Sequence, residues 1–334
     1  MMNPSESLFW NERWRLATLN RSDLQKIGLA SLMVGLIFVM FHLQGNTSDI
    51  NAFGRSVLLW MYTRWSDSSV SFGATDYSHG FLIPLASLGV LWYRRNELFK
   101  ATKSVSKLGL VIFIASLLLH WLGAKSQHPR VSLVALLGIL WGVPFYLFGW
   151  EVAKWLLFPC VFLIFCVPLN FLDELTFPLR MLMAKSSTLL VNGLGIAAER
   201  VGSEIYLSSG DEFIKLDVAA PCSGLRSLMA MTALTAIYAY LTQNGLMRKW
   251  MLFLCSIPLA IVGNIARITT LAVVAEAFGE KVALGMFHDW SGYIVFAVAI
   301  VLMVAAGNLL DVNYQELWKK WKVTLYDHTL LSSA

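Results

Sequence analysis

The chain contains eight apolar runs that are long enough, or nearly long enough, to cross a membrane as helices. A hydrocarbon core about 30 Å thick needs about 20 helical residues per crossing. Hydrophobic side chains make up 57% of the 334 residues and charged ones only 14%, which excludes a water-soluble globule. We therefore predict an all-α polytopic membrane protein with about eight transmembrane helices. The runs cover residues 27–43, 80–93, 108–123, 131–148, 155–171, 224–241, 250–275 and 290–309, and the second is short unless it begins within residues 77–79.

The distribution of lysine and arginine predicts how these runs are oriented. With the amino terminus in the cytoplasm, the inner segments hold fifteen cations and eight acids, and the rest of the chain holds eleven cations and thirteen acids. The net charge is therefore +7 inside and −2 outside, in agreement with +5 for the whole chain. Because cytoplasmic loops carry the excess of basic residues, both termini are predicted cytoplasmic. The basic balance is then explained by membrane lipids and indicates no nucleic-acid partner.

One membrane domain, residues 27–309, is expected between a cytoplasmic leader at 1–26 and a cytoplasmic tail at 310–334. The leader is charged and no small-residue cleavage signature follows the first run, so we expect that run to stay as an anchor. Residues 172–221 form the main outer-face loop. Within it, residues 173–200 carry apolar side chains at helical spacing, which predicts a helix in the membrane interface. Residues 202–218 alternate and contain a Ser-Ser-Gly-Asp turn, which predicts a short β-hairpin before the sixth span.

The four cysteines are not equivalent. Cys160, Cys166 and Cys255 lie inside apolar runs, where a thiol behaves as a small hydrophobic group. Cys222 instead follows a proline at the start of the sixth run, where free N–H groups and the helix dipole favour a thiolate. Arg226, four residues later, lies on the same helical face and adds a positive charge. A cysteine at a helix start is by itself more often inert, so its interpretation depends on the neighbouring spans.

Two more polar residues fall at the predicted depth of Cys222. Arg267 lies in the seventh run, where an arginine at the helix centre costs about 2.5–3.5 kcal/mol on insertion scales. Asn264 shares its helical face, so both can point into one polar cavity, the alternative being an arginine that snorkels to the surface. His288 precedes the eighth run, where an interfacial polar residue beside Trp290 is the alternative. A thiol, a base and a cationic donor at one surface indicate nucleophilic catalysis.

Four segments resemble motifs of the exosortase/archaeosortase family. Three contain the residues just described: Ala-Pro-Cys-Ser-Gly-Leu-Arg at 220–226, Asn-Ile-Ala-Arg-Ile at 264–268 and His-Asp-Trp-Ser-Gly at 288–292. The fourth is Tyr-Ser-His-Gly-Phe-Leu-Ile-Pro at 77–84. Their order and the expected topology agree with the family from about residue 76 to residue 309.

The resemblance implies an integral membrane cysteine transpeptidase that is similar to sortases in chemistry but not in fold. Its partners would be exported proteins whose carboxy-terminal tail holds a motif such as Pro-Glu-Pro, one spanning helix and a basic cluster. The enzyme would cleave beside the motif and transfer the new carboxyl end to an envelope acceptor, often alongside exopolysaccharide production. The site would lie on the extracytoplasmic face of the cell (inner) membrane.

The resemblance also suggests a role for each site residue. Cys222 would attack the scissile carbonyl, His288 would shuttle the proton, and Arg267 would stabilise the oxyanion or the thiolate. Arg226, Asn264 and His79 are expected to support the site, with helix–helix hydrogen bonding or a simple interfacial position as the alternative. We expect neither a metal nor another cofactor, because the other histidines lack ligand spacing and no Cys-x-x-Cys pair or phosphate-binding glycine motif occurs.

Two other classes of protein are compatible with an intramembrane arginine. In a transporter or flippase, Arg267 would bind an anionic substrate and Cys222 would be incidental. In a membrane acyltransferase acting on a lipid-linked sugar, His288 and Asp289 would carry the chemistry. The gathering of polar residues at one surface, away from the midplane, favours the peptidase.

The charge distribution predicts the sidedness of two sites. A reporter fused after Lys249 should behave as cytoplasmic, and one inserted near Ser209 as external, because the cation excess lies on the inner side. Enzymatic activity of paired reporters that work only inside or only outside the cytoplasm measures this. The opposite result at both positions would reverse the placement of the whole site.

Overall fold

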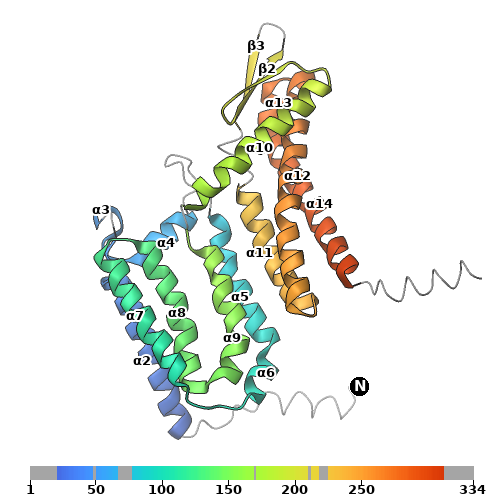
Figure 1. The fold of residues 1–334 in the computed structure, drawn as a ribbon. Coiled ribbons are helices and arrows are strands. Elements are labelled where there is room, and N and C mark those ends of the chain that lie inside the picture. Colours follow the sequence, from blue (N-terminus) through green and yellow to red (C-terminus); the bar gives the residue numbers. More distant parts are fainter. Residues whose placement is uncertain are drawn as a thin grey trace, which may run out of the picture. The chain divides into compact units, whose positions relative to one another are not determined.

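The computed structural model describes residues 21–47, 50–66, 77–168, 171–209, 212–217 and 225–311. Within these residues the protein is mostly helical and contains one three-stranded sheet (Figure 1). Internal contacts divide the chain into two compact units. The first consists of residues 1–63 and 103–150, and the second of residues 64–102 and 151–334.

The first unit is built around an antiparallel helix pair with close backbone approach. Its elements are α2 (Arg21–Leu43), α3 (Ile50–Phe53), α4 (Val57–Ser66, whose last turn belongs to the second unit), α7 (Lys107–Lys125) and α8 (Pro129–Phe148). Glycines allow α7 and α8 to pack together: a Cβ at Gly142 would lie 3.1 Å from the backbone nitrogen of Phe113. Helix α2 joins the pair through the rings of Phe41 and His120, whose centroids are 4.1 Å apart.

The second unit contains the other described helices. They are η2 (Ser78–Phe81), α5 (Leu82–Tyr93), α6 (Arg95–Lys100), α9 (Trp150–Phe162), η3 (Leu163–Cys166), α10 (Phe171–Gly193), α11 (Leu225–Thr242), α12 (Leu246–Phe278), α13 (Glu280–Leu284) and α14 (Met286–Asp311). Helices α11, α12 and α14 pack against one another around Met231, Ala260, Ala299 and Met303. Helix α9 packs on α11, where the rings of Phe158 and Tyr240 stack 3.9 Å apart.

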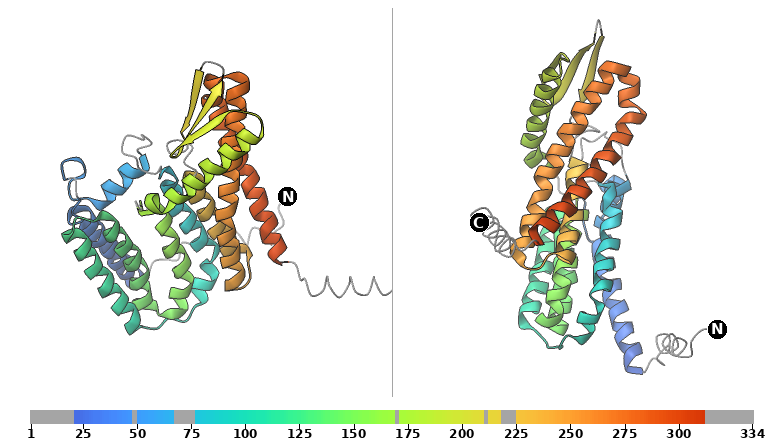
Figure 2. Two further views of the ribbon diagram at one scale, coloured as in Figure 1. Left: turned by 45° about the horizontal axis from the view of Figure 1, so that its top comes forward. Right: turned by 90° about the vertical axis from the view of Figure 1, so that its right-hand side faces the viewer.

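The sheet of the second unit covers one end of α12 (Figure 2). Strands β1 (Ala198–Val201), β2 (Glu204–Ser209) and β3 (Glu212–Asp217) are antiparallel in that order. Ile205 pairs with Leu216 and Leu207 with Ile214, so these four apolar side chains share one face. That face is buried against α10, α12 and α13.

Four described helices are long and apolar enough to cross a membrane. They are Lys107–Lys125, Pro129–Phe148, Leu246–Phe278 and Trp290–Asp311, and they match the third, fourth, seventh and eighth apolar runs. The apolar stretches Ser31–Leu43 and Leu228–Thr242 match the first and sixth. The second and fifth runs form helices of 12 and 13 residues, so the expected total of eight spans stays a prediction.

Two boundaries predicted from the sequence are wrong. The fifth run does not continue as a helix to residue 171: α9 ends at Phe162, and Val167 has an extended backbone. Val167 precedes Pro168, whose ring disfavours a helical conformation of the residue before it. The helix predicted over residues 173–200 does not reach residue 200 either. It ends at Gly193, Gly195 has a φ of +87°, and β1 begins at Ala198.

Gly109 tests the packing of α7 on α8. An added Cβ would press against the backbone nitrogen of Tyr146 and lie 2.5 Å from the carbonyl carbon of Phe145, so Gly109→Ala must push the helices apart. Overpacking of this kind costs about 1–3 kcal/mol, and we expect a lower unfolding temperature in detergent. Gly35→Ala in α2 is the control, because nothing lies within 4 Å of its added Cβ. Equal unfolding temperatures for the two variants would contradict this packing.

Candidate active site

Helix α12 carries two of the candidate site residues close to the predicted outer surface of the membrane. Its 33 residues make a helix about 50 Å long, well beyond the hydrocarbon core of about 30 Å. A crossing of about 20 residues that begins at Trp250, directly after the basic pair of Arg248 and Lys249, ends near Thr269. Arg267 is therefore within one turn of the predicted outer boundary.

The side chain of Arg267 lies against the first turns of α14. Its Nε donates a hydrogen bond to Oγ of Ser291 at 3.5 Å, and Ser291 is buried. A Cβ added to Gly292 would lie 3.5 Å from Cζ of Arg267, so the guanidinium packs directly on this glycine. The lack of a side chain at Gly292 thus allows the close approach of the guanidinium to α14.

His288 is the third residue of α14, and the structure describes its backbone. It precedes Ser291 by three residues, and residues at this spacing are neighbours on a helix surface. The contact of Arg267 with Ser291 therefore brings the guanidinium within one helical turn of position 288. Sequence reasoning singled out Arg267 and His288 but missed Ser291, although its spacing from His288 was a usable signal.

Asn264 has a different partner. Its side chain is 3% exposed, and its Nδ2 donates to the Sδ of Met183 in α10 at 3.2 Å. Met183 belongs to the core between α10, the sheet and the carboxyl-terminal part of α12. Asn264 thus ties α10 to α12, whereas the hydrogen bond of Arg267 runs to α14.

Cys222 lies outside the described residues. Arg226 is the second residue of α11, and the structure describes its backbone. Helix α11 begins three residues after Cys222 and packs against both α12 and α14. The helix that follows the candidate nucleophile therefore belongs to the same bundle as the helices that carry Arg267 and His288.

His79 lies in a separate cluster of the second unit, around η2 and η3. Its Nε2 is 3.2 Å from the carbonyl oxygen of Phe165, and the neighbouring Trp65 donates from Nε1 to the carbonyl of Cys166 at 2.8 Å. Burial lowers the pKa of His79, while the hydrogen bond to Phe165 opposes that change. A neutral ring with a proton on Nε2 donates to this carbonyl, and Nδ1 is buried without a partner among the described residues. These contacts favour a role in holding η3.

The other three cysteines occupy apolar surroundings. Cys166 is buried and donates to the carbonyl of Leu163 at 3.0 Å, and Cys160 and Cys255 are partly buried. All three are free thiols. In the described part of the chain, no three His, Cys, Asp or Glu side chains are grouped so that they could hold a metal ion.

A family model described as Transmembrane exosortase matches residues 65–305. The chain belongs to this family. The match confirms the resemblance seen in the sequence, and it includes all four motif segments. Together with the apolar helices, membership makes the protein a multi-pass membrane protein. Searches of curated proteins and of solved structures found no match.

The four thiols should differ in reactivity. A thiolate favoured by a helix start and by Arg226 should react with a membrane-impermeant maleimide far faster than Cys160, Cys166 or Cys255. Labelling of four single-cysteine variants in intact cells, followed by a gel-shift assay, measures this. If Cys222 and Cys255 were labelled at the same rate, Cys222 would not be an activated nucleophile.

Proposed function

We propose that this exosortase-family protein is a cysteine transpeptidase that cleaves the carboxy-terminal sorting signal of exported proteins. The observation that supports this proposal most strongly is the packing of Arg267 on the α14 segment that begins with His288. An arginine and a histidine at one membrane surface, in a bundle whose third helix follows Cys222, provide the groups that thiol acyl transfer needs.

In the proposed first step, the Cys222 sulfur attacks the scissile carbonyl carbon while His288 accepts the thiol proton. The tetrahedral oxyanion is stabilised by the Arg267 guanidinium. Nε of Arg267 donates to Ser291. The terminal N–H groups of the guanidinium are the part of the side chain suited to a bidentate hydrogen bond with an oxyanion. When the intermediate collapses, the C–N bond breaks and His288 returns the proton to the leaving amine.

The second step resolves the thioester on Cys222. An acceptor amine, or water, attacks the acyl carbon while His288 takes its proton, and the sulfur leaves as a thiolate or thiol. A new amide bond links the client to an envelope acceptor in the first case. In the second case the client is released as a free acid.

The proposed site faces the extracytoplasmic side of the cell membrane, with both termini in the cytoplasm. The charge distribution supports this orientation, because the cation excess lies in the loops opposite to Arg267 and His288. A client with one spanning helix and a basic tail would adopt the same orientation. Its cleavage motif would then lie at the membrane surface beside the site.

Client processing tests the function. The full chain is expressed with an exported protein that ends in the motif, an apolar helix and an arginine cluster, and cleavage is followed by a mass shift. We expect Cys222→Ala and Cys222→Ser to abolish cleavage while the protein stays inserted, because neither side chain can form a thioester. Cys255→Ser is the matched control and should retain processing. Full processing by Cys222→Ala would contradict the proposal and favour a transporter or an acyltransferase.

The same assay separates the roles of the two partners. Arg267→Lys keeps the charge but loses the planar fork, and loss of an oxyanion donor costs about 10²–10³ in rate, so cleavage should slow without stopping. His288→Ala should leave the client uncleaved and no thioester on Cys222. If His288→Ala instead accumulated the thioester, His288 would activate the acceptor, and its assignment as the base for Cys222 would be wrong.

A further inference from the structure

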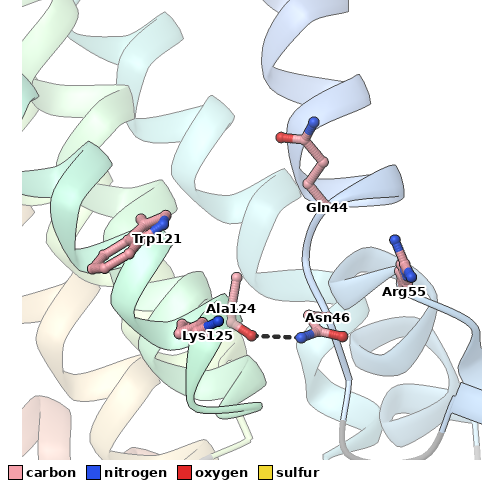
Figure 3. Close-up of a pocket in the computed structure, with 6 residues that line it drawn as sticks. All are labelled: Gln44, Asn46, Arg55, Trp121, Ala124 and Lys125. Atoms are coloured by element: carbon pink, nitrogen blue, oxygen red, sulfur yellow. Dashed lines mark hydrogen bonds between the residues drawn. The ribbon is translucent and has the colours of Figure 1, made fainter.

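The first unit contains a second polar site. The proposed chemistry uses no residue of this unit. An open pocket of about 310 Å³ lies at the carboxyl end of α7, where α7 faces the loop after α2 (Figure 3). By the predicted topology, this is the outer end of both helices. The pocket is lined by Gln44, Asn46, Arg55, Trp121, Ala124 and Lys125.

Hydrogen bonds hold the pocket in shape. Asn46 has a φ of +51°, a conformation that asparagine adopts more readily than most residues. Its Nδ2 donates to the carbonyl of Ala124 at 2.8 Å, and its backbone nitrogen donates to the carbonyl of Arg55 at 3.0 Å. One residue thus fixes the loop to α7 and to the segment that carries Arg55. The hydrogen bonds of Asn46 therefore connect the two segments that carry Arg55 and Lys125, the two cations of the pocket.

The charges of the pocket are not balanced within the described structure. Arg55 and Lys125 are both exposed, and no described carboxylate pairs with either of them. The two predicted outer segments, residues 44–79 and 124–130, contain four cations, Arg55, Arg64, Lys125 and Arg130, and three acids, Asp49, Asp67 and Asp76, all of which lie outside the described residues. These segments are net positive by one charge, whereas the outer surface as a whole is predicted to be net negative. Two exposed cations that line one pocket and pair with no described carboxylate indicate an anionic ligand.

The surface of α7 below the pocket is apolar. Leu118, Trp121, Leu122 and Lys125 recur at helical spacing, so they form one stripe that ends at the cation. Leu118, Trp121 and Leu122 are 61%, 64% and 54% exposed. A tryptophan between apolar and basic residues is typical of the level of the lipid headgroups. The stripe thus offers an apolar surface towards the membrane interior and positive charge at its outer end.

We propose that this pocket binds the phosphate of an anionic phospholipid from the outer leaflet. Arg55 and Lys125 contact the phosphate, the amides of Gln44 and Asn46 contact the polar headgroup, and an acyl chain follows Leu118 and Leu122. The volume of about 310 Å³ is at the lower end of the range for small-molecule sites, which suits a headgroup but not a whole lipid. The proposal does not depend on the peptidase function.

Site-specific photocrosslinking tests the proposal. A p-benzoylphenylalanine in place of Leu118 puts the photoreactive group one turn below Trp121, at an exposed position. The full chain is reconstituted in nanodiscs of phosphatidylcholine with a minor fraction of phosphatidylglycerol, and lipid adducts are identified by mass spectrometry after irradiation. We expect phosphatidylglycerol adducts at no less than about fivefold their share of the bilayer, because about fivefold is the factor for a single basic residue near an anionic surface and the pocket has two.

Charge variants in the same background identify the cause. Arg55→Gln with Lys125→Gln should return the adducts to the bilayer composition, whereas Arg55→Lys with Lys125→Arg should keep the enrichment. The matched control removes two exposed cations near the other end of α7, by Lys103→Gln with Lys107→Gln, and should also keep it. Enrichment that is absent in the parent protein, or unchanged by Arg55→Gln with Lys125→Gln, would overturn the proposal.

A phosphate could also come from a soluble compound. Irradiation is therefore repeated with excess glycerol 3-phosphate, which carries the charged group without the acyl chains. Because a lipid headgroup is held at high local concentration and gains apolar contacts, the enrichment should persist. Complete loss of phosphatidylglycerol adducts would overturn the lipid assignment and identify a site for soluble phosphate.

Discussion

The arrangement of the second unit depends on one helix that is longer than the membrane is thick. Helix α12 contributes Ala260 to the core shared with α11 and α14, and Ile268, Ala272 and Ala275 to the core shared with α10 and the sheet. About 50 Å of continuous helix can join both cores without a break. Arg267 lies between the two, next to Ile268, the first buried residue that α12 contributes to the core with α10 and the sheet. A guanidinium there is close enough to the interface to avoid the full cost of burial in hydrocarbon.

The proposed nucleophilic chemistry would have a physical advantage at the predicted membrane surface. A thiolate and an oxyanion need polar donors, which lipid does not provide, and a client anchored by one helix presents its cleavage site close to the headgroups. Fixed donors in a region with little water also act more strongly than the same groups in bulk solvent. The packing of Arg267 on Ser291 and Gly292 shows how such a donor is held against α14.

The sequence predicted this fold best where one physical signal was dominant. The four described helices that are long and apolar enough to cross a membrane were recognised from apolar length alone, because the bilayer imposes that length. The ends of α9 and α10 were missed for local reasons. Pro168 disfavours a helical backbone at Val167, which ends the helical stretch after η3, and a glycine with positive φ turns the chain from α10 towards β1. The strand β1 was also missed, since its pairing with β2 depends on a partner and not on its own four residues.

The motif around residue 288 has a physical explanation that its sequence alone does not reveal. Ser291 accepts the hydrogen bond of Arg267, and Gly292 leaves room for the guanidinium. The exposed rings of Trp290 and Tyr293 stand edge to face, with centroids 6.5 Å apart, as aromatic residues at a membrane surface often do. Within this turn, Ser291 and Gly292 contact Arg267, whereas Trp290 and Tyr293 are exposed. Such a division follows from the helical period, so the segment can fix the depth of α14 and the position of Arg267 at the same time.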